Sequence, residues 1–378
     1  MTEAAGFGLG AESGSRQKLV QNRELLLAKT LTKALEDFSD PSSMAVKAWK
    51  NRDKMSTAFL LDLPGAHNQW TSAAFSEAIC LLLALPSIGC KELLGLPVGD
   101  RQFDLFGSEV LCANLPGGSW TRRHDCIKGC ISSLCVYAGA NFVCEPFSIF
   151  SAHIPQRPLN RLQAHQARQA LRPDFLFHNP SRNGNPERVI ADVKTVSLGN
   201  KQLYRPGMQG DKAVQLRAVK IQGEYSRIAQ SVDRELGQGD KEGPTLKKLR
   251  SFPPVLDLVF GAYGECSEGV KKLMDSLVSI KLQSLGLRKG VPGGDKELSQ
   301  VTSYLRRRLS SAVMQANVCC LQERLIQVGE GFGQAGKRRR LEKIEQRREK
   351  LDREAQWMAR VTGRRLVRTG DFLENFKH

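Results

Sequence analysis

The sequence lacks the long apolar segments that a membrane protein needs. Its longest apolar run, ICLLLALP at residues 79–86, is far shorter than the about 18 residues of a membrane-spanning helix. The first fifteen residues, MTEAAGFGLGAESGS, also lack the apolar centre of a secretory signal. These absences predict an intracellular protein with no membrane partner.

Cysteine pairs at zinc-ligand spacing are missing as well. The chain has 10 cysteines, expected to be reduced thiols inside the cell, but no C-x-x-C motif. The one Cys/His cluster consists of Cys112, His124, Cys126 and Cys130. A metal there is one interpretation. Core packing is the simpler one, because Cys126 and Cys130 lie one helical turn apart on an apolar face.

Acidic residues are scarce relative to basic ones. The 56 Lys and Arg outnumber the 39 Asp and Glu, which gives a net charge of +17. This excess favours a polyanionic partner, with nucleic acid ahead of an anionic membrane surface. A solvated basic surface would give the same composition, so charge alone leaves both interpretations open.

The basic residues concentrate near the C-terminus. Residues 337–368 contain 13 basic and 5 acidic side chains and begin with Lys337, Arg338, Arg339 and Arg340. We expect this segment to be a helical arm that binds the nucleic-acid backbone without reading its sequence. A solvated helix laced with ion pairs is the alternative, and KRRR also fits a nuclear-localisation patch.

The order of expected helices and strands predicts an α/β fold with one mixed sheet and no internal repeats. Helices are expected within residues 16–60, at 70–85, at 121–138 before Gly139, at 211–236 and at 301–327. Strands are expected at 141–150, 172–177, 188–197 and 251–264. At 378 residues the chain is long enough for about two domains of ordinary size. We divide it into a flexible tail and helical region (1–65), a lead-in (66–120), a core (121–265), a helical extension (266–335) and a basic arm (336–378).

Two of the expected strands carry charged residues where a buried strand should have none. RPDFLF contains Asp174, and ERVIADVKTVS contains Asp192 and Lys194, which share one strand face. If the strands form a hairpin, the two carboxylates converge and suit a divalent cation such as Mg²⁺. An ammonium beside it can orient or activate a water. Charges on an edge strand, or a D-x-K triplet by chance, are the alternative explanations.

The order Glu145, Pro173-Asp174 and Asp192-Val193-Lys194 resembles the PD-(D/E)XK, or restriction-endonuclease-like, nuclease superfamily. The resemblance implies an αβββαβ core and an endonuclease that hydrolyses DNA with Mg²⁺ or Mn²⁺. It implies Asp174, Asp192 and the carbonyl of Val193 as metal ligands. Lys194 would position the attacking water, and Glu145 would bind the metal through water or a second ion. For Glu145, a carboxylate at a strand end is an equally simple interpretation.

A narrower resemblance covers residues 70–330. The string DLFGSEVLCANLPGGSWTRRHDCIKG, followed by the EP, RPD and DVKTVS segments, resembles the endonuclease region after the reverse transcriptase domain of some non-LTR retroelement proteins. No YxDD-like motif is present, so a reverse transcriptase would have to be a partner on another chain. Of the Cys and His pattern before the Arg-His pair, only Cys112 and His124 remain, which puts a zinc site in doubt. Lys194 is retained, which favours catalysis.

Several further residues are candidates for contact with DNA, or with RNA as the alternative. Arg123 and His124 begin the first core helix, where they could contact phosphate or simply cap and pack. In the helix at 211–236, one face carries Arg217, Lys220, Glu224 and Tyr225, and that face could look into the site or at water. If catalysis is lost, the same features describe a nucleic-acid-binding or assembly protein on a nuclease-like fold.

Overall fold

The computed structural model describes residues 43–62, 69–98, 101–115, 117–146, 148–151, 171–179, 187–204, 212–234, 242–287 and 294–331. The chain divides into two units, Met1–Arg324 and Leu325–His378. The expected N-terminal tail and the basic arm at 336–378 lie outside the described residues. No helix within the described ranges is long and apolar enough to cross a membrane.

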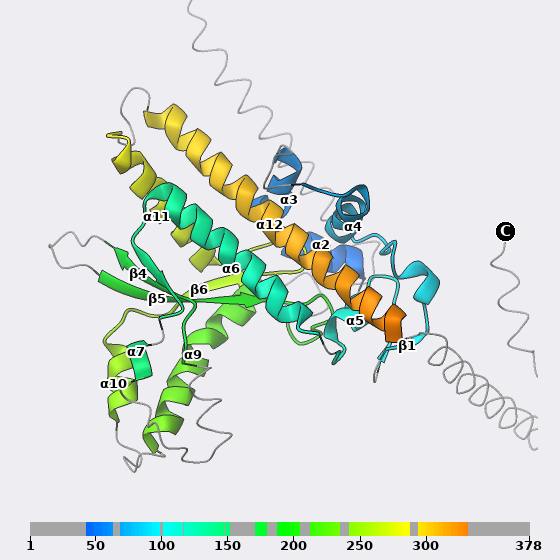
Figure 1. Cartoon of the computed structure of the whole chain (residues 1–378), viewed down its shortest axis with the longest axis horizontal. Helices are drawn as coiled ribbons and strands as arrows, with labels where there is room; N and C mark the ends of the chain where they lie inside the picture. The colour runs from blue at the N-terminus through cyan, green and yellow to red at the C-terminus, as the bar shows by residue number, and fades with distance from the viewer. Residues whose placement is uncertain are drawn as a thin grey trace, which may run out of the picture. The chain divides into compact units, whose positions relative to one another are not determined.

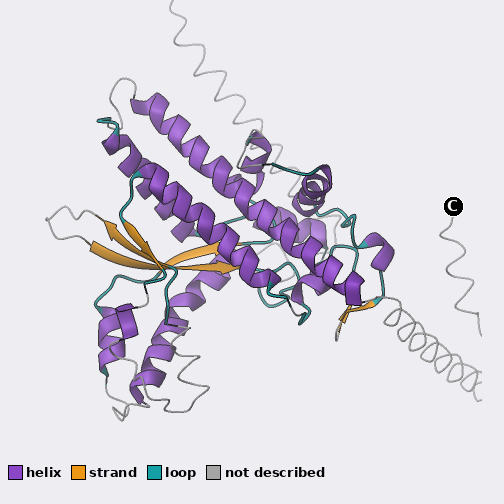
Figure 2. Ribbon diagram, viewed as in Figure 1, coloured by secondary structure: helices purple, strands orange, loops and turns teal. Residues whose placement is uncertain are grey.

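A four-stranded mixed sheet lies at the centre of the first unit (Figure 2). Its strands, in spatial order, are β3 (Phe142–Cys144), β4 (Phe175–Asn179), β5 (Glu187–Thr195) and β6 (Leu256–Phe260). The first two pairings are antiparallel and the last is parallel. The predicted mixed α/β architecture is therefore confirmed, as is the pairing of the two charged strands.

Helices cover both faces of this sheet (Figure 1). One face packs against α6 (Ser119–Ala138) and α11 (Glu268–Ser284), and α12 (Gly294–Gly331) adds side chains to the same apolar core. The opposite face carries α9 (Ala213–Asp233), which packs against α10 (Pro244–Arg250). Apolar side chains of the strands fill the space beneath α6 and α11 and form the main core, among them Phe175, Val193 and Leu258.

The helix α6 shows how local sequence positions the site. Gly118 at φ +68° precedes it, and Gly139 at φ +79° ends it, a left-handed conformation that glycine adopts without steric cost. Residues Ile127, Ile131 and Leu134 recur at helical spacing and are buried against the sheet. Polar residues of α6 beside these apolar ones, His124 and Lys128, reach Asp174 next to the strands. The predicted end at Gly139 is confirmed.

Shorter elements precede the sheet. They are α2 (Met44–Asn51), α3 (Lys54–Ala58), the 3₁₀ turn η1 (Phe59–Leu61), α4 (Ser72–Leu83), η2 (Lys91–Leu93), the hairpin strands β1 (Pro97–Val98) and β2 (Arg101–Gln102), and α5 (Ser108–Cys112). The predicted helix at 70–85 corresponds to α4, which ends earlier because Ala84 adopts φ +54° two residues before Pro86.

Two predicted strands are shorter than expected. The strand at 141–150 ends at Cys144, because Glu145 adopts φ +46° and Pro146 has no N–H to donate. The short helix α7 (Ser148–Ser151) follows it. The strand predicted at 251–264 is reduced to β6 at 256–260, since Pro253 and Pro254 cannot donate ladder hydrogen bonds.

Candidate active site

Acidic residues form a row across the strands at one end of the sheet. Phe175 pairs with Ala191, so the same register continued by one residue sets Asp174 opposite Asp192. The Asp174 N–H donates to the Ala191 carbonyl at 3.1 Å, and the Glu145 N–H donates to the Asp174 carbonyl at 2.8 Å. Glu145, just after β3, and Asp174, just before β4, thus lie beside Asp192 of β5 along the backbone.

The row continues into β6, where Asp257 pairs with Asp192. Its carboxylate oxygen Oδ2 lies 3.4 Å from the N–H of Gly269 in the first turn of α11. Negative charge is favourable at a helix N-terminus. Asp257 therefore has a structural partner, and the candidate carboxylates are those of Glu145, Asp174 and Asp192.

The carboxylates of Asp174 and Asp192 are both buried, with 9% and 2% of each residue exposed. Burial raises the pKa of Asp192, Lys194 opposes this rise, and the negative charge of Asp174 adds to it. Burial would also raise the pKa of Asp174, but hydrogen bonds from His124 and from the Val193 N–H, at 2.7 Å, lower it. The protonation of each carboxylate therefore depends on the charge of the other. As pH falls, Asp192, whose pKa is raised, takes up a proton before Asp174, whose pKa is lowered.

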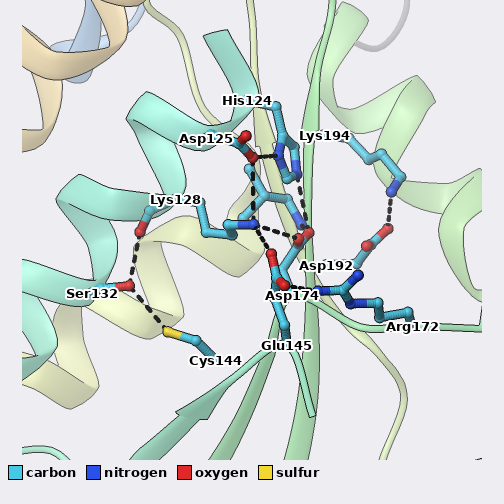
Figure 3. Close-up of polar contacts among 11 residues, drawn as sticks. His124, Asp125, Lys128, Ser132, Cys144, Glu145, Arg172, Asp174, Asp192 and Lys194 are labelled. Carbon is cyan, nitrogen blue, oxygen red and sulfur yellow. Dashed lines mark hydrogen bonds and ion pairs between the residues drawn. The ribbon is translucent and has the colours of Figure 1, made fainter. Parts of the chain in front are cut away.

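Lys194 and α9 complete the other side of Asp192. The Lys194 ammonium lies 2.5 Å from Asp192 Oδ2, and its side chain is about one third exposed (Figure 3). Tyr225 of α9 is buried, and burial together with the charges of Asp192 and Asp174 raises the pKa of its hydroxyl well above the ordinary value. Tyr225 therefore stays a neutral phenol beside the two carboxylates.

His124 contacts the site from α6. Its Nε2 lies 3.2 Å from Asp174 Oδ2, and its Nδ1 lies 3.0 Å from Asp125 Oδ1. Burial alone would lower the pKa of His124, but these two carboxylates outweigh burial and raise it. A protonated ring donates to both. Contact with phosphate and capping or packing were both open for His124, and in the structure its ring is directed at Asp174.

Lys128, one helical turn beyond His124, lies among the remaining carboxylates (Figure 3). Its ammonium forms ion pairs with Glu145 and with Asp125, the latter at 3.4 Å, and lies 3.9 Å from Asp174 Oδ1. Arg172 pairs with the other oxygen of Glu145. Glu145 is thus held by two cations in the structure.

The other candidates for nucleic-acid contact are placed differently. Arg123 is only 4% exposed, and its Nη2 donates to the hydroxyls of Thr195 and Ser197. Of the two interpretations of Arg123, contact with phosphate or packing, this buried position favours packing, and the phosphate contact stays a prediction. Arg217 pairs with Glu224 at 2.9 Å on the surface of α9.

Lys220 is exposed on α9, so a polyanion could reach its ammonium. Residues Lys337, Arg338, Arg339 and Arg340 lie outside the described ranges. Their proposed role therefore stays a prediction.

The cysteine cluster does not converge on a metal. Cys126 is exposed and Cys112 and Cys130 are partly buried, so packing in the core accounts for Cys126 poorly. Burial raises the pKa of the Cys130 thiol to about 12, which keeps it protonated. Among the described residues, no group of three or more His, Cys, Asp and Glu could hold a metal ion.

Two carboxylates and a backbone carbonyl remain the candidate ligands for one hard divalent ion. Mg²⁺ is commonly held by one or two carboxylates, with water at its remaining positions. Asp174 and Asp192 supply two such ligands, and the Val193 carbonyl is the candidate third.

Lys128, Arg172 and Tyr225 were absent from the predicted site residues. Lys128 could have been found, since it follows His124 by four positions and so shares its face of the helix. Arg172 directly precedes Pro173-Asp174. The helical spacing placed Tyr225 on the same face as Arg217, but spacing alone does not determine which of these side chains points toward the sheet.

Comparison of the chain with models of known protein families, with curated proteins and with solved structures finds no match.

Proposed function

We propose that this protein is a metal-dependent endonuclease that hydrolyses phosphodiester bonds of DNA, built on a restriction-endonuclease-like core. The observation that carries the proposal is the pairing of Asp174 with Asp192 at the end of two antiparallel strands, with Lys194 on the same strand as Asp192. The element order α6, β3, β4, β5, α9, β6 supports it, since it follows the αβββαβ order of that superfamily.

Asp174 and Asp192 would hold one Mg²⁺ or Mn²⁺ ion together with the Val193 carbonyl. Such an ion polarises a phosphate oxygen and lowers the pKa of a bound water. Two buried carboxylates are costly without a compensating cation, and the raised pKa of Asp192 reflects this cost. In the structure Lys194 supplies positive charge to Asp192, and His124 and Lys128 supply it to Asp174, so a bound metal would add to these cations.

Lys194 would orient the attacking water and stabilise negative charge on the phosphate in the transition state. Its ammonium is tied to Asp192 in the structure, but its side chain is partly exposed and can reach a substrate. Tyr225 would keep its proton and pack beside Asp192, which limits the access of bulk water from the α9 side.

The net charge of +17 supports a polyanionic substrate. The resemblance to the endonuclease region of non-LTR retroelement proteins supports a mobile-element origin and a reverse transcriptase as a partner. A nuclear location fits a protein that acts on chromosomal DNA.

Incubation with supercoiled plasmid tests this function. We expect conversion to the nicked form with Mg²⁺ or Mn²⁺, and none after addition of EDTA. Binding without nicking under all metal conditions would instead favour a catalytically inactive DNA-binding protein. Cleavage of RNA but not of DNA would correct the substrate.

A further inference from the structure

Basic residues recur at a seven-residue interval along α9. They are Lys220, Arg227 and Arg234, the last of which directly follows the end of the helix and keeps its backbone conformation. All three are exposed. Seven residues make nearly two turns and rise by about 10 Å, so these side chains follow one another along one line of the helix. We call these three residues the α9 basic stripe.

The stripe lies on the side of α9 that faces away from the sheet. The opposite side of the helix is buried and includes Ile221, Tyr225 and Ala229. At 3.6 residues per turn, Arg227 lies about 160° around the helix from Tyr225. Figure 1 shows α9 on one face of the sheet with α10 next to it. The stripe therefore faces solvent, and Tyr225 faces the acidic residues of the candidate site.

The acidic residues of α9 are already occupied by other partners. Glu224 accepts from both Nη atoms of Arg217, at 2.9 and 3.0 Å. Asp233 is 2% exposed and accepts the N–H groups of Thr245 and Leu246, each at 2.9 Å. Among the described residues, none forms an ion pair with a member of the stripe. A helix face that is only solvated usually carries charges of both signs, which this one does not.

The side chains beside the stripe restrict the kind of polyanion that fits it. In the part of α9 that the structure describes, Val219 is the one large apolar side chain that is exposed. No exposed aromatic ring is there to stack on the bases of a single strand. One valine is also too little apolar surface for a helix that lies in a membrane interface. Charge without stacking or insertion matches the phosphate backbone of a duplex.

We propose that the α9 basic stripe binds the phosphate backbone of duplex DNA, at a surface separate from Asp174 and Asp192. Such contacts fix the position of the duplex and carry no sequence information. The inference needs no metal ion. It rests on the proposed function only in taking DNA as the partner.

The dependence of binding on salt tests the inference. Fluorescence anisotropy measures the affinity of the full chain for a labelled DNA duplex over a range of salt concentrations, with EDTA present so that no hydrolysis occurs. A triple variant removes the charges of the stripe with Lys220→Gln, Arg227→Gln and Arg234→Gln. Its slope of log affinity against log salt should be smaller by about 2–3 units, at about 0.9 per phosphate. Two duplexes of unrelated sequence should lose affinity by the same factor.

A matched control removes three charges from exposed positions on other elements, with Lys54→Gln, Lys91→Gln and Lys272→Gln. It should leave the slope nearly unchanged, because the net charge falls equally but the stripe is intact. Exchange of each stripe residue for the other basic type, with Lys220→Arg, Arg227→Lys and Arg234→Lys, should keep the slope of the wild type. Circular dichroism verifies that each variant is folded. Where the triple variant is not, Lys220→Gln and Arg227→Gln should each lower the slope by about one unit.

An unchanged slope in the folded triple variant, or an equal decrease in the control, would overturn the inference. An unchanged DNA slope together with lost binding to vesicles of phosphatidylserine and phosphatidylcholine would also overturn it, and would assign the stripe to a membrane surface. Absence of plasmid nicking under every metal condition would overturn the proposed function alone, since the stripe is tested with EDTA present.

Discussion

Glu265 gives the protein a stability that depends on pH near neutrality. The residue follows β6 and is fully buried. Burial raises its pKa from 4.5 to about 7, against the hydrogen bonds that it accepts from the Tyr204 hydroxyl at 2.7 Å and from the Tyr263 N–H at 2.9 Å. The negative charge of Asp53 adds to the rise.

The direction of the effect follows from proton binding. Between pH 4.5 and about 7 the folded state keeps the Glu265 proton, whereas the unfolded chain releases it. The contribution of Glu265 to stability is therefore fully present below the unfolded pKa and is lost as pH rises through the folded pKa. The rise of the pKa from 4.5 to about 7 makes this loss roughly 3.5 kcal/mol, at about 1.4 kcal/mol for each tenfold change in proton affinity.

Urea unfolding of the wild type and of Glu265→Gln at pH 5.5, 6.5, 7.5 and 8.5 measures the effect. The free energy of unfolding of the variant should rise relative to the wild type by about 2 kcal/mol between pH 5.5 and 8.5, because glutamine does not ionise. Asp174 and Asp125 raise the pKa of His124 above its ordinary value, and this contribution is common to both proteins, so the difference between the two is the relevant quantity. Parallel curves would refute the reasoning.

Two further predictions concern basic residues. Arg123→Ala should lower the free energy of unfolding by about 2–3 kcal/mol, because the hydroxyls of Thr195 and Ser197 lose the buried guanidinium that donates to them. The affinity of the folded variant for DNA should stay unchanged. The control is the neighbouring Arg122→Ala, which removes an exposed ion pair with Glu323 and should hardly change the melting temperature. A large loss of DNA affinity in Arg123→Ala but not in Arg122→Ala would instead show that Arg123 contacts phosphate. Removal of residues 337–378 should reduce the slope of log affinity against log salt by several units at about 0.9 per phosphate, measured by fluorescence anisotropy. An unchanged slope would place the DNA contact elsewhere.

Sequence periodicity was sufficient for the sheet but not for its exact ends. Alternation and turn residues located β4 and β5, and glycine located the end of α6, because these signals are local. The end of β3 depends on the left-handed backbone of Glu145, which no pattern announces. The later start of β6 follows from Pro253 and Pro254, which precede it and which the apolar run obscured.

The site was predictable only in part for a related reason. Asp174, Asp192 and Lys194 stood out because charge is unusual in a buried strand. Arg123 and His124 are adjacent in the sequence, yet one turns beneath α6 and the other toward Asp174. The direction of each side chain depends on how α6 is rotated against the sheet, which arises from long-range packing of residues such as Ile127.

The central claim is that the Asp174–Asp192 pair carries metal-dependent hydrolysis while other residues bind the DNA. The most direct test is single-turnover cleavage of plasmid by Asp192→Asn and by the wild type, with protein in saturating excess so that affinity cannot limit the rate. The account predicts nicking by the wild type with Mg²⁺ or Mn²⁺, no detectable nicking by Asp192→Asn, and nearly equal DNA affinity of the two proteins. Equal cleavage rates would contradict it.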